Sequence, residues 1–163
     1  MIKINFYPDS DLMDFSEALG EYKKIWEEDG EKIINQWESY TGFKFKETEI
    51  NTTVFAGRSH SHPLSLRFSN TYEKKKATLV HELGHRLIVG NANRTGRPSS
   101  LDAHKELNLV LYDVSVNIYG EAFANEMIEI EKAFDDMYKE AWEWALQFSK
   151  EERLQKFKEI MLG

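Results

Sequence analysis

The sequence predicts a single α+β domain in which a small twisted sheet precedes a mainly helical half. The chain has 163 residues, which is the usual length of one domain and is enough to bury one core. Apolar residues alternate with polar ones near the N-terminus, as in strands, and recur every three or four positions after about residue 70, as in helices. No internal repeat and no linker interrupts the sequence, so we expect residues 1–163 to form one unit.

The first half is expected to contain short strands around one long helix. Apolar residues at alternate positions from Ile2 to Phe6 predict a first strand. Apolar residues spaced three, four or seven apart between residues 12 and 40 predict an amphipathic helix, which Gly42 ends.

Two strands and another helix are expected next. Residues 43–56 favour a strand, and residues 57–63 form a loop that reads Gly-Arg-Ser-His-Ser-His-Pro. Alternation over residues 64–68 predicts a short edge strand, and the following apolar periodicity predicts a helix over residues 72–89.

The rest of the chain is expected to be helical. After a loop over residues 91–100, Ser99 with Asp102 resembles a capping box at the start of a long apolar helix, which Gly120 interrupts. The apolar stripe continues into a further helix, and two shorter helices close the chain, the second of them capped at Ser149.

Composition and charge exclude several classes of function. The chain carries 21 Lys and Arg against 28 Asp and Glu, and the resulting net charge of −7 argues against a nucleic-acid binder. The absence of cysteine excludes a disulfide scaffold, a zinc finger and a cysteine nucleophile. The N-terminal residues do not resemble a signal peptide, and the most apolar stretch, residues 107–118, is too short to cross a bilayer. We therefore expect a cytoplasmic protein without nucleic-acid or membrane partners, whose oligomeric state the sequence leaves open.

The motif His81-Glu82-Leu-Gly-His85 lies within a helical pattern and points to metal chemistry. Residues four apart share one helix face, so His81 and His85 can direct two imidazoles at one ion. Glu82 projects about 100° away and places a carboxylate beside that ion. Neutral imidazoles suit Zn²⁺, and a zinc site with an open position generates a nucleophilic hydroxide. The alternative is a structural histidine pair with a glutamate that faces its own helix.

Residues 78–87 resemble the active-site helix of the zincin metallopeptidases. That family's pattern has Val or Thr three positions before the first histidine and a hydrophobic residue two positions after the second, and Thr78 and Leu87 fit. Arg86 departs from the pattern, because its position is normally uncharged. The resemblance covers about residues 60–125 without identifying a subfamily. It implies a zincin-like fold, with residues 64–68 as the edge strand before the active-site helix.

The resemblance also implies a third protein ligand. In the gluzincin branch a glutamate about twenty residues after the second histidine supplies it, and an aspartate one turn later supports a ligand histidine. His104 lies 19 residues after His85, and Asn108 lies one turn further, so these two residues occupy the corresponding places. Asn108 would orient a ligand imidazole, or else make an ordinary polar contact inside its helix.

Glu121 is the rival third ligand. The segment from Glu121 to Asn125 resembles the Glu-x-x-Ala-Asn segment of small gluzincin-like proteases that cut phage and stress repressors. Glu106 and Asp113 are further alternatives, and Asp113 would either support the ligands or pair with an arginine.

Four more residues have both a functional and a structural interpretation. His60 and His62 would bind substrate or stabilise the oxyanion, or would lie in a solvated loop. Tyr112 and Tyr119 would donate to the oxyanion, or would belong to the core.

The sequence therefore predicts a zinc-dependent metallopeptidase that cuts a peptide or protein substrate. His81, His85 and His104 would hold Zn²⁺ with water in the fourth position, and Glu82 would act as the general base. An extended substrate would pair antiparallel with the edge strand over residues 64–68. Two alternatives remain: a zinc-binding regulatory or interaction domain without turnover, and a structural domain in which the motif is accidental.

Overall fold

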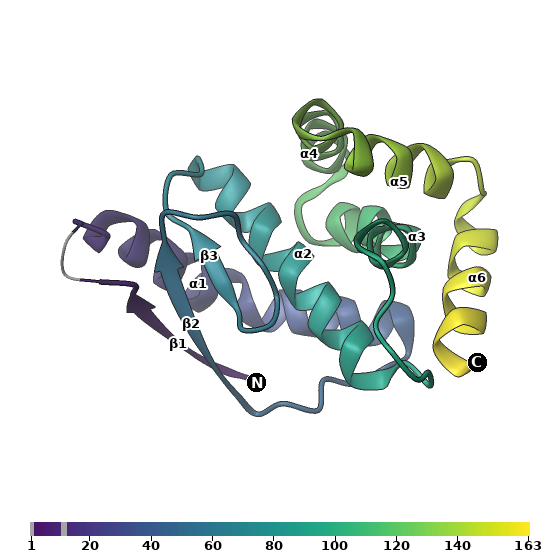
Figure 1. Ribbon diagram of the computed structural model, residues 1–163, viewed down its shortest axis with the longest axis horizontal. Helices are drawn as coiled ribbons and strands as arrows, with labels where there is room; N and C mark the ends of the chain where they lie inside the picture. Colours follow the sequence, from purple (N-terminus) through teal and green to yellow (C-terminus); the bar gives the residue numbers. More distant parts are fainter. Residues whose placement is uncertain (1, 11–12) are drawn as a thin grey trace.

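The computed structural model describes residues 2–10 and 13–163 and has a small sheet at one end and a helical half at the other, with α2 between them (Figure 1). Part of the predicted apolar stripe, at Leu12, lies outside the described residues. The elements in chain order are β1 (Lys3–Pro8), α1 (Ser16–Thr41), β2 (Glu49–Phe55), β3 (Ser65–Arg67), α2 (Tyr72–Asn91), α3 (Ser100–Tyr119), α4 (Glu121–Phe134), α5 (Asp136–Leu146) and α6 (Lys150–Leu162). The α+β prediction is confirmed.

The sheet has three strands in the order β1-β2-β3, and all three are parallel. Ile4 lies opposite Ile50, and Val54 lies opposite Leu66. A parallel neighbour needs a crossover connection, and the 26 residues of α1 provide it between β1 and β2. Alternation predicted where the strands lie but not their direction, because a parallel and an antiparallel strand show the same alternation when one face is buried.

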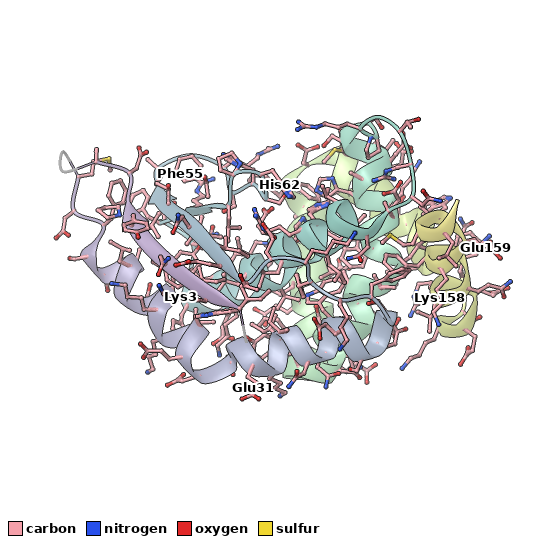
Figure 2. All side chains as sticks on the ribbon, turned by 90° about the horizontal axis from the view of Figure 1, so that it is seen from below. Lys3, Glu31, Phe55, His62, Lys158 and Glu159 are labelled. Carbon is pink, nitrogen blue, oxygen red and sulfur yellow. The ribbon has the colours of Figure 1, made fainter. Side chains whose placement is uncertain are left out.

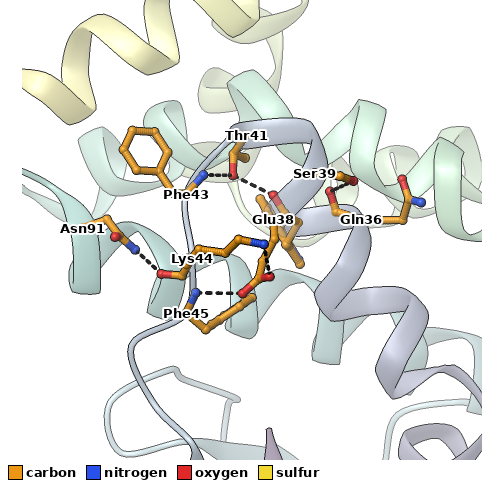
Figure 3. Close-up of polar contacts among 9 residues, drawn as sticks. Gln36, Glu38, Ser39, Thr41, Phe43, Lys44, Phe45 and Asn91 are labelled. Atoms are coloured by element: carbon orange, nitrogen blue, oxygen red, sulfur yellow. Dashed lines mark hydrogen bonds and ion pairs between the residues drawn. The ribbon is translucent and has the colours of Figure 1, made fainter. Parts of the chain in front are cut away.

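The connection from α1 to β2 is held by polar contacts rather than by regular structure (Figure 3). Gly42 ends α1 with a φ of 81°, in the left-handed region. Glu38 then accepts hydrogen bonds from the backbone N–H of Phe45 at 3.1 Å and from Nζ of Lys44 at 2.7 Å. Nδ2 of Asn91 donates to the carbonyl oxygen of Lys44 at 2.9 Å. The connection is therefore joined to the C-terminal end of α2.

The helical half is arranged around α3, which contacts α1, α2, α4, α5 and α6. Side chains that precede the helices cap them. Ser99 caps α3 and Ser149 forms a capping box with Glu152 at α6, as the sequence predicted, and Thr71 caps α2. No helix within the described residues is both long and apolar enough to cross a membrane.

Gly84 is the point at which α2 comes closest to its neighbours. A Cβ atom at this position would lie 2.4 Å from Cζ2 of Trp37 and 2.6 Å from Cδ1 of Leu107. Trp37 is fully buried, and its Nε1 donates to the carbonyl oxygen of Val80 at 3.2 Å. A glycine at position 84 therefore lets α2 pack directly on α1 and α3.

We expect Gly84→Ala to lower the free energy of unfolding by up to about 2 kcal/mol. The added methyl group must displace Trp37 or Leu107, which costs about 1–3 kcal/mol, and this exceeds the gain in helix propensity of about 1 kcal/mol. Gly20→Ala in α1 is the matched control, because nothing lies within 4 Å of its added Cβ, and it should stabilise the protein by about 0.5–1 kcal/mol. Urea unfolding followed by circular dichroism measures both, and equal stabilisation by the two substitutions would contradict the close packing at Gly84.

Candidate metal centre

Three histidines from two helices converge on one point. Candidate ligand nitrogens of His81, His85 and His104 all lie within 4.8 Å of one another. His81 and His85 lie one turn apart on α2, and His104 belongs to the first turns of α3. Their ring centroids are 4.8 to 5.3 Å apart. Among the residues that the structure describes, this is the one cluster of three or more histidine and carboxylate side chains with metal-site spacing.

Neighbouring acceptors lie beside two of the three rings. Nδ1 of His104 lies 2.7 Å from the carbonyl oxygen of Ser100, which can only accept, so Nδ1 carries the proton and Nε2 is free. Nδ1 of His81 lies 3.3 Å from Oε1 of Glu131, which is an ion-pair distance without the geometry of a hydrogen bond, so this carboxylate lies beside the ring on the Nδ1 side. Metal-binding histidines commonly have such a partner on the second nitrogen.

Glu131 on α4 is a site residue that the sequence analysis missed. Nε1 of Trp142 donates to its Oε2 at 2.8 Å, and Nζ of Lys74 lies 3.3 Å from its Oε1. Burial alone would raise its pKa, but His81, Lys74 and Trp142 hold the pKa of this carboxyl well below its usual range. Glu131 lies on the same face of α4 as the buried Met127 and Ile128, and this spacing could have indicated that its carboxylate is buried. Because α4 contains several other acidic residues, Glu131 was not singled out.

The charges of the three imidazoles follow from their surroundings. Burial lowers the pKa of His85 well below its ordinary value and that of His104 to about 4, so both rings are neutral, the form that binds metals. Burial would also lower the pKa of His81, but the negative charge of Glu131 outweighs it and raises that pKa.

The three histidines lie in a cleft made of two adjoining pockets. The smaller pocket, of about 190 Å³, and the larger pocket, of about 460 Å³, share His81, Glu82 and Tyr138 among their lining residues. His85 and His104 line the larger pocket. Glu82 is only 7 % exposed, and burial raises the pKa of its carboxyl. The arrangement thus places one carboxylate beside three imidazoles, facing both pockets.

Tyr138 on α5 is the second residue that the sequence analysis missed. Its ring centroid lies 4.7 Å from that of His104 and 6.1 Å from that of His81. Burial raises the pKa of its hydroxyl to about 12, so it is a hydrogen-bond donor. Nothing in the sequence near Tyr138 indicates that α5 folds back over α3, so no local signal was available.

The two tyrosines that the sequence suggested as oxyanion donors lie outside both pockets and bond elsewhere. The hydroxyl of Tyr112 donates to Oδ1 of Asn125 at 3.1 Å, and the hydroxyl of Tyr119 donates to Oδ2 of Asp29 at 2.9 Å. Both tyrosines pack against the core instead, which was the structural interpretation of these residues.

His60 and His62 both line the larger pocket, and His62 lies between the sheet and the helical half (Figure 2). Residues 57–63, which we call the covering loop, fold back along β3. The backbone N–H and C=O of His60 bond to those of Ser65 at 3.0 and 2.9 Å, and Ser59 accepts from the backbone N–H of Arg67 at 2.8 Å. The expected antiparallel substrate strand along residues 64–68 is therefore wrong for this structure, because the chain's own loop occupies that edge.

Arg86, which departs from the zincin pattern, holds the covering loop. Its guanidinium forms an ion pair with Glu47 and donates to the carbonyl oxygen of Ser61. The extra charge beside the motif is thus neutralised and serves to connect α2 with the sheet side of the cleft.

The rival third ligands lie away from the histidines. Glu121 is exposed on the first turn of α4 and lines neither pocket. Glu106 is buried and forms an ion pair with Arg94. Neither carboxylate belongs to the cluster of the three histidines.

Asp113 and Asn108 contribute to the core of the helical half. Asp113 forms a 2.7 Å ion pair with Arg153, which is the structural interpretation that the sequence left open. Asn108 is fully buried, and within the described residues neither polar atom of its side chain has a hydrogen-bond partner. Glu131, rather than Asn108, therefore lies beside a ligand imidazole.

The chain was compared with protein-family models, with curated proteins and with solved structures, and none of the three comparisons finds a match. The function of the chain is therefore inferred from the geometry and the chemistry of its histidine cluster.

We expect Glu131→Gln to weaken zinc binding by roughly 10–100-fold, because a neutral amide no longer raises the basicity of His81. Glu129→Gln is the matched control, since Glu129 is exposed on the same helix and pairs only with Lys132 among the described residues, at 3.1 Å. Competition with a chelating dye at equal folded fraction measures both affinities. Equal affinities in the two variants would show that the carboxylate beside His81 does not support the site.

Proposed function

We propose that this protein is a zinc-dependent metallopeptidase. One observation carries the proposal: His81, His85 and His104 present ligand nitrogens within 4.8 Å of one another, beside the buried carboxylate of Glu82. Three protein ligands and one open position are typical of catalytic zinc sites, whereas structural sites use four. The resemblance to the zincin motif in sequence points to the same chemistry.

The donor set fits zinc. All three donors are imidazole nitrogens, which suit Zn²⁺. The second nitrogen of His104 bonds to the carbonyl oxygen of Ser100, and that of His81 lies 3.3 Å from the carboxylate of Glu131. Zinc bound here would polarise the carbonyl of the scissile peptide and lower the pKa of a water molecule.

The protein's own residues would supply the proton transfers. Glu82 accepts a proton from the attacking water and passes it to the leaving amine as the C–N bond breaks. The hydroxyl of Tyr138, which faces the same cleft, donates a hydrogen bond to the carbonyl oxygen as negative charge develops there. His60 and His62 line the larger pocket and would contact the substrate.

A zinc-binding regulatory or interaction domain without turnover is the second candidate function. The observation that favours it is the covering loop, which occupies the β3 edge through His60 and Ser59. A peptidase of this design needs another way to align its substrate, whereas a binding domain does not.

We expect the purified protein to hold about one equivalent of zinc, His104→Ala to weaken zinc binding strongly, and Glu121→Ala to leave it unchanged. The reason is geometric: His104 belongs to the histidine cluster, whereas Glu121 lies roughly 25 Å further along if the intervening chain is helical. Elemental analysis of protein prepared without a histidine tag, followed by zinc competition, measures both effects. If Glu121→Ala weakened zinc binding more than His104→Ala did, Glu121 would be the third ligand and His104 would not bind the metal.

We expect Glu82→Gln to keep its zinc and its fold and to lose peptide turnover by roughly 10²–10⁴-fold, since it removes the proton acceptor but no metal ligand. Hydrolysis of a peptide library by the zinc-loaded protein, read by mass spectrometry, is the measurement. Loss of zinc from this variant would instead place Glu82 on the metal, and wild-type protein that binds zinc but cuts no peptide would favour the binding domain.

A further inference from the structure

We propose that the larger pocket recognises acidic side chains on one side of the scissile bond, so that the substrates are acidic peptide segments. The inference rests on the proposed function and names its substrate class. Three arginines line this pocket, Arg58, Arg94 and Arg97, and Glu82 is the one acidic residue among the described residues that line it. This excess of positive charge is notable because the whole chain has a net charge of −7.

The three arginines differ in whether a carboxylate of the protein already neutralises their charge. Arg94 forms an ion pair with the buried Glu106 and is fixed by it. Arg58 is more exposed and contacts Asp135 only at 3.4 Å. Arg97 is exposed and has no carboxylate partner among the described residues. Arg97, and in part Arg58, therefore has hydrogen-bond donors and charge to offer to a ligand carboxylate.

The positive charge acts on groups inside the cleft. Burial lowers the pKa of His62, and the charges of Arg86 and Arg97 lower it further. The positive electrostatic potential of these arginines also attracts an incoming carboxylate, because the low-dielectric walls of a cleft strengthen the potential inside it.

The smaller pocket does not share this character. Its Lys74 lies 3.3 Å from Glu131, which also lines the pocket, and the wall on the α4 side is formed by Ile130 and Phe134. Arg58 lines both pockets, and Arg67 and Lys74 line the smaller one together with Glu82 and Glu131. Arg97, which has no carboxylate partner among the described residues, lines only the larger pocket. Preference for acidic side chains should therefore hold on one side of the scissile bond and not on the other.

A peptide fits these observations better than a nucleic acid does. Nucleic-acid binding uses a basic face or stripe that follows a chain of phosphates, in a domain that is basic as a whole. Here the chain as a whole is acidic, and the unpaired charge of Arg97 lines a pocket that also holds the three histidines.

The test uses zinc-loaded wild-type protein and zinc-loaded Glu82→Gln. The probes are fluorescent peptide pools with five random central residues, flanked by Glu-Glu on the N-terminal or on the C-terminal side. Pools with Gln-Gln or Lys-Lys at the same places provide the comparison. Binding to Glu82→Gln is read by anisotropy, and cleavage by the wild type is read by mass spectrometry. An oligodeoxythymidine of ten nucleotides is added as a competitor.

We expect one Glu-Glu pool to bind and be cut about ten-fold better than its Gln-Gln counterpart, with a preference that weakens as salt is added. Introduced into both proteins, Arg97→Glu should reduce the binding and cleavage of that pool by about five-fold or more. Lys23→Glu, an exposed residue on α1 outside the cleft that changes the net charge equally, should leave both unchanged.

Equal handling of the Glu-Glu and Gln-Gln pools would overturn the inference while leaving the peptidase intact. Equal losses in Arg97→Glu and Lys23→Glu would overturn it too, because the effect would then follow net charge alone. Displacement of the acidic pool by the oligonucleotide at similar concentration would point to general anion binding and would also overturn it. Tight binding of one acidic pool without any cleavage would support the recognition and contradict the proposed peptidase.

Discussion

The packing of α2 against α1 and α3 at Gly84 is the contact on which the rest of the molecule depends. A side chain at this position would collide with Trp37 and Leu107, so the backbone itself forms the interface. The same contact sets the distance between the helices that carry the histidines, because His81 and His85 flank Gly84 on α2, and His104 lies one turn before Leu107 on α3. Core packing and the spacing of the three imidazoles are therefore one constraint, because the leucine and tryptophan that fill the core also set the distance between the two helices.

The histidine cluster and its surroundings come from different parts of the chain. The histidines lie on α2 and the start of α3, whereas Glu131 and Tyr138 arrive from α4 and α5 after the chain has turned back. The sheet side contributes Glu47 and the covering loop, joined to α2 by Arg86. Each wall of the cleft thus belongs to a separate set of elements, and α2 contacts both β3 on the sheet side and α3 in the helical half.

Sequence reasoning succeeded where the signal was local. The helices, their hydroxyl caps and the placement of His81 and His85 on one helix face follow from spacing along the chain. His104 was implied by the resemblance to the zincins, with Glu121 as its rival, and the structure places His104 beside the pair. Sequence reasoning failed where long-range contacts decide: alternation does not reveal that the three strands are parallel, and no pattern around residue 131 or 138 shows which neighbour each side chain meets. The β3 edge was misjudged for the same reason, since a loop of serines and histidines reads as solvated until its backbone is seen to pair with Ser65.

The covering loop has a consequence for how the molecule meets copies of itself. Unpaired strand edges are templates for association between chains, and natural proteins protect them. Here the backbone hydrogen bonds between His60 and Ser65 occupy the outer edge of β3, so that this edge cannot pair with a strand of another chain. Any event that lifts the loop to admit an extended chain would expose the same edge to a second molecule. The position of the covering loop therefore affects two properties in opposite directions. A lifted loop would admit an extended chain at the β3 edge, and it would also make self-association easier.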